Sequence, residues 1–452
     1  MRNGQRAFGM LLVLLGLLFN PFVLSFLFSN DGNIGSPIIL TAVFAVECLM
    51  VLSGIMVYRT EKEWPLNVAL AVITAFFSLL VAVGADRLYG AFFMPENDDI
   101  LFPAFSVAKQ KTSEFELNVR INNLGFRGPN AQVSKTKKRV VLIGDSFTFG
   151  WGVELEQTWV HQLSEKFPDI EFLNLGQGGN HPGDHVRVAK TVLPLLKPDL
   201  IMVCILQGND LHQLMRMVEF EEAGRQTQPI SSKGETGLEM LRRHLGIIFP
   251  NFSKRFPATT HIQERWKLDA EHLLSQLTDV QKEKYRTIPA ELRSDLELGL
   301  LNPSLIFESV HHPKMFFESA DTALPLCQKG IIRLHDHLLE LENLAADNGS
   351  DLLFVSLPNR PYGFPETKRQ LSELGFDLSG ADTLNANLPI ELAVKSLGSI
   401  LISPTIPADQ GPVFFSYDGH WNENGNRIFA AQLISVLEQG HTWKHFLTSS
   451  DF

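Results

Sequence analysis

The sequence has few cysteines and no excess of positive charge. Its three cysteines, Cys48, Cys204 and Cys327, are spread over 452 residues, so they do not form a disulfide framework. The net charge is −11 at pH 7, which gives no electrostatic attraction to nucleic acid, and no nucleic-acid partner is expected. There is also no internal repeat and no low-complexity tract. The length predicts more than one domain, since a domain usually has about 100–200 residues.

Long apolar runs are confined to the amino terminus. Three of them cover about Phe8–Phe28, Pro37–Tyr58 and Leu66–Gly84, and each is near the ~20 residues that a membrane-spanning helix needs. The first run could instead be a cleaved signal peptide, but no small-x-small cleavage site is evident and two more runs follow. We therefore expect residues 1–85 to form a membrane anchor with three transmembrane helices.

The basic residues around these runs predict their orientation. Arg2 and Arg6 precede the first run, and Arg59 and Lys62 lie between the second and the third. Basic residues favour the cytoplasmic side of a membrane, so everything after Gly84 is expected on its far side. This predicts a protein embedded in the cell (inner) membrane, with its remaining domains in the periplasm or outside the cell.

The rest of the chain predicts an interrupted α/β fold. Residues 86–117 are interpreted as a linker, although 115–119 has the alternation of a short strand. From Arg139 onward, strand-like and helix-like segments alternate, which is typical of a parallel sheet covered by helices on both faces. The expected strands are 140–143, 170–174, 200–206, 352–357 and 399–402, and the expected helices are 158–167, 185–196, 331–347 and 427–438. We expect a three-layer α/β/α sandwich built from residues 118–216 and 326–452.

The alternation stops between residues 217 and 325. This interval is polar and helix-forming, for example over 262–277 and 278–284. It interrupts the α/β fold, and a helical insertion of this size beside a site is a candidate lid or substrate-selecting element. A helical insertion with no role in the reaction is the alternative.

A glycine-aspartate-serine turn follows the first expected strand. Val140–Ile143 is apolar, Gly144 permits a tight bend, and Asp145 and Ser146 come next. A serine there lies at the carboxyl edge of a parallel sheet, where open α/β folds place their active sites. No Gly-x-Ser-x-Gly pattern surrounds it, which argues against the nucleophile elbow of the α/β-hydrolases.

Three later segments join this turn in a set of four blocks. They are 174–179 (Asn-Leu-Gly-Gln-Gly-Gly), 207–210 (Gln-Gly-Asn-Asp) and 418–422 (Asp-Gly-His-Trp-Asn). Together with Gly-Asp-Ser, they resemble the four blocks of the SGNH (GDSL-type) hydrolase family, over roughly Asn118–Leu437. The segment 122–127 (Asn-Asn-Leu-Gly-Phe-Arg) is similar to one found just ahead of the catalytic domain in many bacterial members. The resemblance implies a flavodoxin-like sheet and an ester hydrolase, and together with the apolar runs it suggests a membrane-anchored bacterial member of the family.

The residues of these blocks predict a catalytic site. A serine hydroxyl needs a base within hydrogen-bond reach, and the base needs an orienting group. We expect Ser146 to attack, His420 to take its proton and Asp418 to hold the imidazolium. The family's last block is usually Asp-x-x-His, whereas here Tyr417 stands three residues before His420 and the acid stands two before it. A backbone carbonyl that orients His420 is the alternative to Asp418.

The resemblance also implies three donors for the oxyanion that forms during acyl transfer. They are the backbone amide of Ser146, the backbone amide of Gly179 and the side chain of Asn209, with Gly178 as the alternative to Gly179. A glycine lets its N–H approach the substrate without a side chain in the way.

A second polar cluster follows the 174–179 block. His181, Asp184 and His185 lie within five residues of one another, and such side chains can bind Zn²⁺. A metal site needs a further ligand and supporting outer contacts, which the sequence does not indicate. We therefore predict no metal and no cofactor.

These features favour a serine esterase that hydrolyses O-acyl esters through an acyl-serine intermediate. Its expected substrate is an acylated small molecule, a lipid or an envelope glycan. Two alternatives stay open. One is an O-acyltransferase that acts on an envelope polysaccharide, and the other is a non-catalytic glycan-binding module that has kept the fold. The intact set of Ser146, Gly179, Asn209 and His420 argues against the non-catalytic module.

Overall fold

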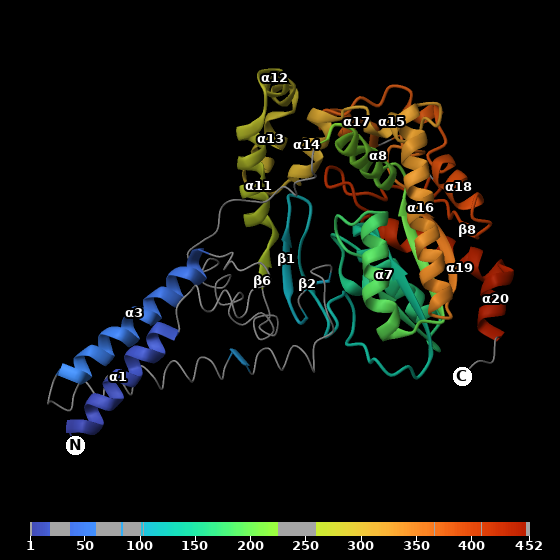
Figure 1. The fold of residues 1–452 in the computed structure, drawn as a ribbon. Coiled ribbons are helices and arrows are strands. Elements are labelled where there is room, and N and C mark those ends of the chain that lie inside the picture. The colour runs from blue at the N-terminus through green and yellow to red at the C-terminus, as the bar shows by residue number, and fades with distance from the viewer. Residues whose placement is uncertain are drawn as a thin grey trace. The chain divides into compact units, whose positions relative to one another are not determined.

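The chain divides into two units, which are described separately. The structure is a computed structural model, and it describes residues 2–18, 37–59, 83–84, 101–102, 104–224, 259–365, 367–407 and 409–448 (Figure 1). The first unit comprises Met1–Met94 and Ile247–Asn251, and the second comprises Pro95–Gly246 and Phe252–Phe452.

The described part of the first unit contains two long helices that pack against each other. They are α1 (Arg2–Leu18) and α3 (Pro37–Arg59). Gly9 and Gly54 face each other where the helices meet, and a Cβ added at Gly9 would lie 2.7 Å from the Gly54 carbonyl oxygen. The two glycines therefore allow the close backbone approach, and Leu12, Met50 and Val57 form the small buried cluster beside it.

The three predicted transmembrane helices find no support in the structure. Among the residues that it describes, no helix combines the length and the apolar character needed to cross a bilayer. The third apolar run, 66–84, lies outside the described residues except for its last two positions, and so does the end of the first run from residue 19 onward.

The second unit is built on a five-stranded parallel sheet, which confirms the predicted α/β fold. The strand order is β4-β3-β5-β7-β8, and every neighbouring pair is parallel. The bounds are Lys138–Ile143 for β3, Ile170–Asn174 for β4, Leu200–Leu206 for β5, Asp351–Leu357 for β7 and Leu401–Ile402 for β8. The strands β4 and β5 coincide with the predicted segments, because both are apolar runs that are almost entirely buried.

Helices cover both faces of this sheet (Figure 1). On β3, Val141 and Ile143 point into one core and Val140 and Leu142 into the other, as the two-residue period of a strand requires. The first core includes residues of α7 (Pro182–Leu196), α8 (Asn209–Glu222), α16 (Pro325–Asp347) and α18 (Leu388–Lys395). The second includes residues of α6 (Trp159–Lys166), α19 (Glu423–Gln439) and α20 (His441–Thr448). The result is a three-layer α/β/α arrangement.

A second, smaller sheet was largely missed by the sequence analysis. Its order is β2-β1-β6, with β1 (Val107–Lys111) antiparallel to β2 (Glu116–Arg120) and parallel to β6 (Thr259–His261). The strand β1 lies in the segment interpreted as a linker, and β6 lies in the interval expected to be helical. Both are short and polar, so pairing with neighbouring strands rather than apolar alternation determines their conformation.

The interval from 217 to 325 contains five helices among its described residues. They are α11 (Ile262–Gln276), α12 (Asp279–Thr287), α13 (Ala290–Glu297), α14 (Pro303–His311) and α15 (Met315–Glu318). Residues 225–258 lie outside the described residues. These helices share a separate apolar core with α17 (Thr367–Glu373) and with residues up to Ala386. The inserted helices are therefore packed together with a later part of the chain that the sequence analysis assigned to the α/β fold.

Candidate active site

The serine of the first block begins a very short helix at the end of β3. The helix α5 (Ser146–Phe149) is capped by Asp145, whose Oδ1 accepts a hydrogen bond from the Phe147 amide at 2.9 Å. Gly150 ends the helix with a left-handed backbone at φ 80°, a conformation that favours glycine. The Ser146 amide is the first N–H of α5, so it has no acceptor within the helix and can donate to a bound ligand.

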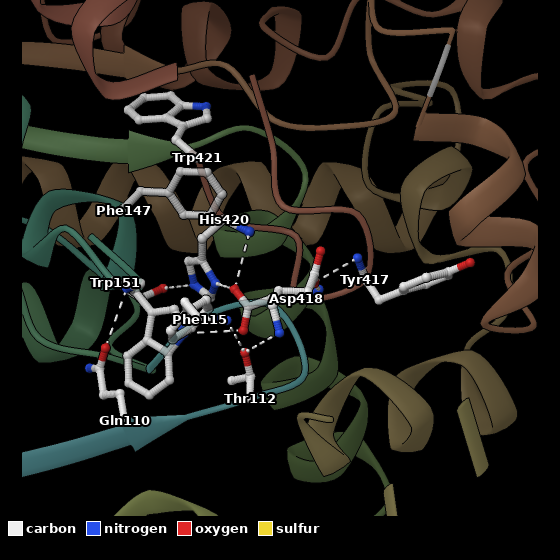
Figure 2. Close-up of polar contacts among 12 residues, drawn as sticks. Gln110, Thr112, Phe115, Phe147, Trp151, Tyr417, Asp418, His420 and Trp421 are labelled. Atoms are coloured by element: carbon white, nitrogen blue, oxygen red, sulfur yellow. Dashed lines mark hydrogen bonds and ion pairs between the residues drawn. The ribbon is translucent and has the colours of Figure 1, made fainter. Parts of the chain in front are cut away.

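Ser146, His420 and Asp418 form a continuous hydrogen-bonded array. The Nε2 atom of His420 lies 2.7 Å from Oγ of Ser146. On the other side of the ring, Nδ1 lies 2.6 Å from Oδ1 of Asp418, and Figure 2 shows the imidazole beside this carboxylate. The acid therefore reaches the imidazole although it stands two residues before it in the sequence. Gly419, between them, has φ +92°, which folds the chain back so that the carboxylate meets the ring.

Aromatic rings fix the position of His420. Its ring centroid lies 5.0 Å from that of Phe147 and 5.8 Å from that of Trp151. The backbone around it is held as well, because Phe414 and Trp421 form an antiparallel bridge and the Phe415 amide donates to the His420 carbonyl at 2.9 Å. The histidine is therefore placed by the loop before α19 and by the residues that follow Ser146.

Residues of the second block, 174–179, contact the serine turn and hold it in place. The Asn174 side chain donates to the Thr148 carbonyl at 2.8 Å and accepts from the Gly176 amide at 3.0 Å. A Cβ added at Gly176 would collide with the backbone of Thr148 and Phe149. The 174–179 segment thus contacts α5 directly, and this contact requires a glycine at position 176.

Arg127, from the segment that precedes the first block, holds the residues after α5. It is 2% exposed, and its guanidinium donates to the carbonyls of Phe149 at 3.3 Å, of Gly150, and of Val153 at 2.6 Å. Burial lowers the pKa of Arg127 to about 10, so it is still protonated at neutral pH. Its side-chain hydrogen bonds all go to backbone carbonyls, and its guanidinium lies over the Phe149 ring, which indicates a structural role for this loop.

The candidate oxyanion donors lie at the ends of β4 and β5. A Cβ added at Gly178 or at Gly179 meets nothing within 4 Å. Gly179 has a left-handed backbone with φ +84°. Both glycines therefore adjoin open space, and only Gly179 has a backbone conformation that requires glycine. Asn209 is the first residue of α8 and is half-buried. Among the described residues, its side-chain amide makes no hydrogen bond, so it can donate to a ligand.

Two buried carboxyl groups, one in the serine turn and one at the start of α8, are close enough to influence each other. Asp145 follows β3 and Asp210 follows β5, and burial raises the pKa of Asp145 to about 6 and that of Asp210 well above its usual range. The negative charge of Asp145 also raises the pKa of Asp210. Each carboxyl has one oxygen without a hydrogen-bond partner among the described residues. Burial and mutual repulsion therefore disfavour a negative charge on both carboxyl groups at the same time.

In the polar cluster after the second block, His185 is buried whereas His181 and Asp184 are partly exposed. His185 is fully buried, neither ring nitrogen has a hydrogen-bond partner in the described part of the chain, and burial lowers its pKa to about 3. His181 instead caps α7 by accepting from the Gly183 amide. Within the described ranges, no group of three or more His, Cys, Asp or Glu side chains is placed to hold a metal ion.

Three residues near the array were not identified from the sequence. The Trp151 indole donates to Oδ2 of Asp418 at 3.1 Å, so both carboxylate oxygens of the acid are engaged. Glu114 and Arg360 contact the backbone on either side of the loop that carries Asp418. Trp151 had one sequence signal, its place five residues after Ser146, whereas the other two lie far from every block.

Comparisons with known proteins give only distant structural matches. No protein-family model matches the sequence, and no curated protein does. Among solved structures, the crystal structure of TesA is 11% identical, with 67% of this chain and 99% of that chain covered and a TM-score of 0.31. A G-D-S-L family putative lipolytic protein from Desulfitobacterium hafniense is 12% identical, and the match covers 66% of this chain and 99% of that chain with a TM-score of 0.31. A catalytic mutant of an acetylxylan esterase from Geobacillus stearothermophilus is 12% identical, and the match covers 69% of this chain and 98% of that chain with a TM-score of 0.30. These scores are too low to decide a family or an activity.

Proposed function

We propose that this protein is a serine esterase of the SGNH (GDSL-type) hydrolase family that acts on O-acyl esters. The observation that supports this most strongly is the array of Ser146, His420 and Asp418, with 2.7 Å and 2.6 Å between the hydrogen-bonded atoms. These distances fit a nucleophile, a base and an orienting acid. The location of the site outside the cytoplasm stays a prediction from the charges around the amino-terminal apolar runs.

The geometry supports a two-step reaction. In the first step, Oγ of Ser146 forms a bond to the ester carbonyl carbon while its proton passes to Nε2 of His420. The tetrahedral intermediate collapses, the bond to the leaving alcohol breaks, and His420 returns the proton to the alcohol oxygen. In the second step, His420 takes a proton from a water molecule that attacks the acyl-serine, and Ser146 leaves with that proton. Asp418 holds the ring and stabilises the imidazolium throughout.

The developing oxyanion needs donors that are already in place. We assign this role to the Ser146 amide, the Gly179 amide and the Asn209 side chain. The open surroundings of Gly179 and the absence of a described partner for the Asn209 amide leave these groups available. Fixed donors of this kind stabilise charge in the transition state without reorganisation.

The direct test is the hydrolysis of 4-nitrophenyl acetate by the full chain and by Ser146→Ala. We expect kcat/KM to fall on the order of 10³-fold or more, because the serine supplies the bond-forming atom. Ser164→Ala is the matched control, since Ser164 lies on α6 and donates only to the Val160 carbonyl. Unchanged turnover in Ser146→Ala would remove this serine from the mechanism. Turnover that requires a polysaccharide acceptor would instead indicate an acyltransferase.

A further inference from the structure

The loop that carries the candidate acid has little support of its own. Asp418 stands two residues before His420, and the turn between them depends on the left-handed backbone of Gly419. The three residues Ser416, Tyr417 and Asp418 belong to no helix or strand. Their backbone N–H and C=O groups therefore need partners from elsewhere in the chain.

Glu114 supplies the partners for the amides. Its carboxylate accepts hydrogen bonds from three consecutive backbone N–H groups: Ser416 donates to Oε1, and Tyr417 and Asp418 donate to Oε2 at 2.9 and 2.7 Å. Hydrogen bonds to an ionised acceptor are about twice as strong as neutral ones. One side chain therefore fixes the direction of the backbone over the whole approach to the acid.

Arg360 supplies the partners for the carbonyls. Its guanidinium donates to the Ser416 carbonyl at 2.6 Å and to the Tyr417 carbonyl at 3.1 Å. The side chain is 2% exposed and lies against Gly419, where an added Cβ would collide with it. Burial lowers the pKa of Arg360 to about 10, so it remains a cation at neutral pH. The loop is thus held between a carboxylate on its N–H groups and a guanidinium on its carbonyls.

The hairpin of β1 and β2 determines where Glu114 lies. In the turn between these strands, Oγ1 of Thr112 accepts from the amides of Glu114 and Phe115 at 3.1 and 3.2 Å. Phe115 packs against Trp151, with ring centroids 6.4 Å apart, and Figure 2 shows Thr112, Phe115 and Trp151 close to Asp418. On β1, Gln110 accepts from the Gly152 amide at 3.3 Å. The hairpin therefore contacts both the loop of the acid and the residues that follow α5.

We propose that Glu114 is a positioning residue for the triad acid, which makes the β1–β2 hairpin part of the active site. This inference rests on the proposed esterase function. Glu114 does not touch the reacting atoms. It acts by holding the backbone of Asp418, which in turn sets the distance between the carboxylate and Nδ1 of His420. Misplacement of a catalytic group by about 1 Å can cost on the order of 10²-fold in rate.

The test is a double-mutant cycle on the full chain with 4-nitrophenyl acetate as the substrate. We expect Glu114→Ala to lower kcat on the order of 10–100-fold with KM within about twofold, because the chemistry and not the binding depends on the acid. Glu114→Gln keeps the shape but loses the charge and one acceptor oxygen, so its loss should be smaller. In an Asp418→Asn background, Glu114→Ala should have little further effect, since the two residues act as a unit.

The matched control is Glu116→Gln, two residues further along the same hairpin. Glu116 is exposed and pairs with Lys111, so its kcat should equal that of the wild type. Equal losses from Glu114→Ala in the wild-type and Asp418→Asn backgrounds would show a general structural effect and overturn the proposal, as would a kcat of Glu114→Ala within twofold of wild type. If Ser146→Ala and Asp418→Asn both keep full turnover, the proposed esterase function has failed instead.

Discussion

The two ends of the Ser146–His420–Asp418 array are supported in different ways. At the serine end, the contacts come from Asn174, Gly176 and Arg127, which lie in segments with recognisable sequence patterns. At the acid end, the supporting side chains come from a hairpin turn (Glu114), from the residues after α5 (Trp151) and from the segment after β7 (Arg360), and none of them belongs to a sequence block. The nucleophile is thus built into the sheet edge, whereas the acid depends on polar contacts from distant parts of the chain.

The two ends also differ in the physical nature of their support. Gly176 contacts the backbone of α5 so closely that no side chain fits. Close packing therefore determines which residues can support the serine end. The acid end consists of hydrogen bonds between ionised side chains and a loop backbone. Packing defects should therefore affect stability at the serine end, and loss of single donors or acceptors should affect the rate at the acid end.

Among the changes that test this comparison, the largest effect on the rate is expected at Asn209, the proposed oxyanion donor at the start of α8. Asn209→Ala should lower kcat about 10²–10³-fold, because one preorganised donor is lost. Asn209→Asp, which keeps the shape but not the N–H groups, should lose about as much. Steady-state kinetics with 4-nitrophenyl acetate measure both, and a loss below threefold in either variant would exclude Asn209 from the oxyanion site.

A smaller effect, on the free energy of unfolding rather than on the rate, is expected when the close contact at Gly176 is disturbed. Gly176→Ala should lower the free energy of unfolding by about 1–3 kcal/mol, because the added methyl collides with the backbone of Thr148 and Phe149. Gly178→Ala is the matched control, since nothing lies within 4 Å of its added Cβ. Urea unfolding followed by circular dichroism gives the free energy of unfolding of both variants. Equal values would contradict the proposal that close packing at Gly176 excludes a side chain.

The smallest effect is expected from the second donor on the acid. Trp151→Phe removes the indole N–H that bonds Oδ2 of Asp418 but keeps a ring beside His420. We expect kcat to fall about threefold to tenfold, since a typical hydrogen bond contributes roughly 0.5–1.5 kcal/mol and about 1.4 kcal/mol corresponds to tenfold in rate. Trp266→Phe is the control, because Trp266 stacks on Trp151 at 5.7 Å without a described bond to the acid. A larger loss in Trp266→Phe than in Trp151→Phe would contradict this assignment.

The sheet and the serine end were predictable because their determinants are local. Buried parallel strands such as β4 and β5 are apolar runs, and the glycines and polar residues at their carboxyl ends stand at fixed places in the sequence. The strand β1, Val-Ala-Lys-Gln-Lys, has no such pattern, since its conformation depends on β2 and β6. Glu114 and Arg360 bond to backbone groups, which every residue possesses. The side chains of the loop at 416–418 therefore give no sign in the sequence of these two partners. The helix α16 begins at Pro325, six residues before the start that was predicted at 331.

The hairpin has a practical consequence for how this protein can be shortened. The sequence places the start of the catalytic region at Asn118, inside β2, and a shortened protein beginning there would retain Ser146, Asn209, Asp418 and His420. It would lack β1, the partner of both β2 and β6, together with the carboxylate that orders residues 416–418. Such a fragment would contain every residue of the proposed catalytic set, and we still expect it to have low esterase activity. A shortened protein that is meant to keep the proposed activity should therefore begin before Val107, ahead of all the sequence blocks.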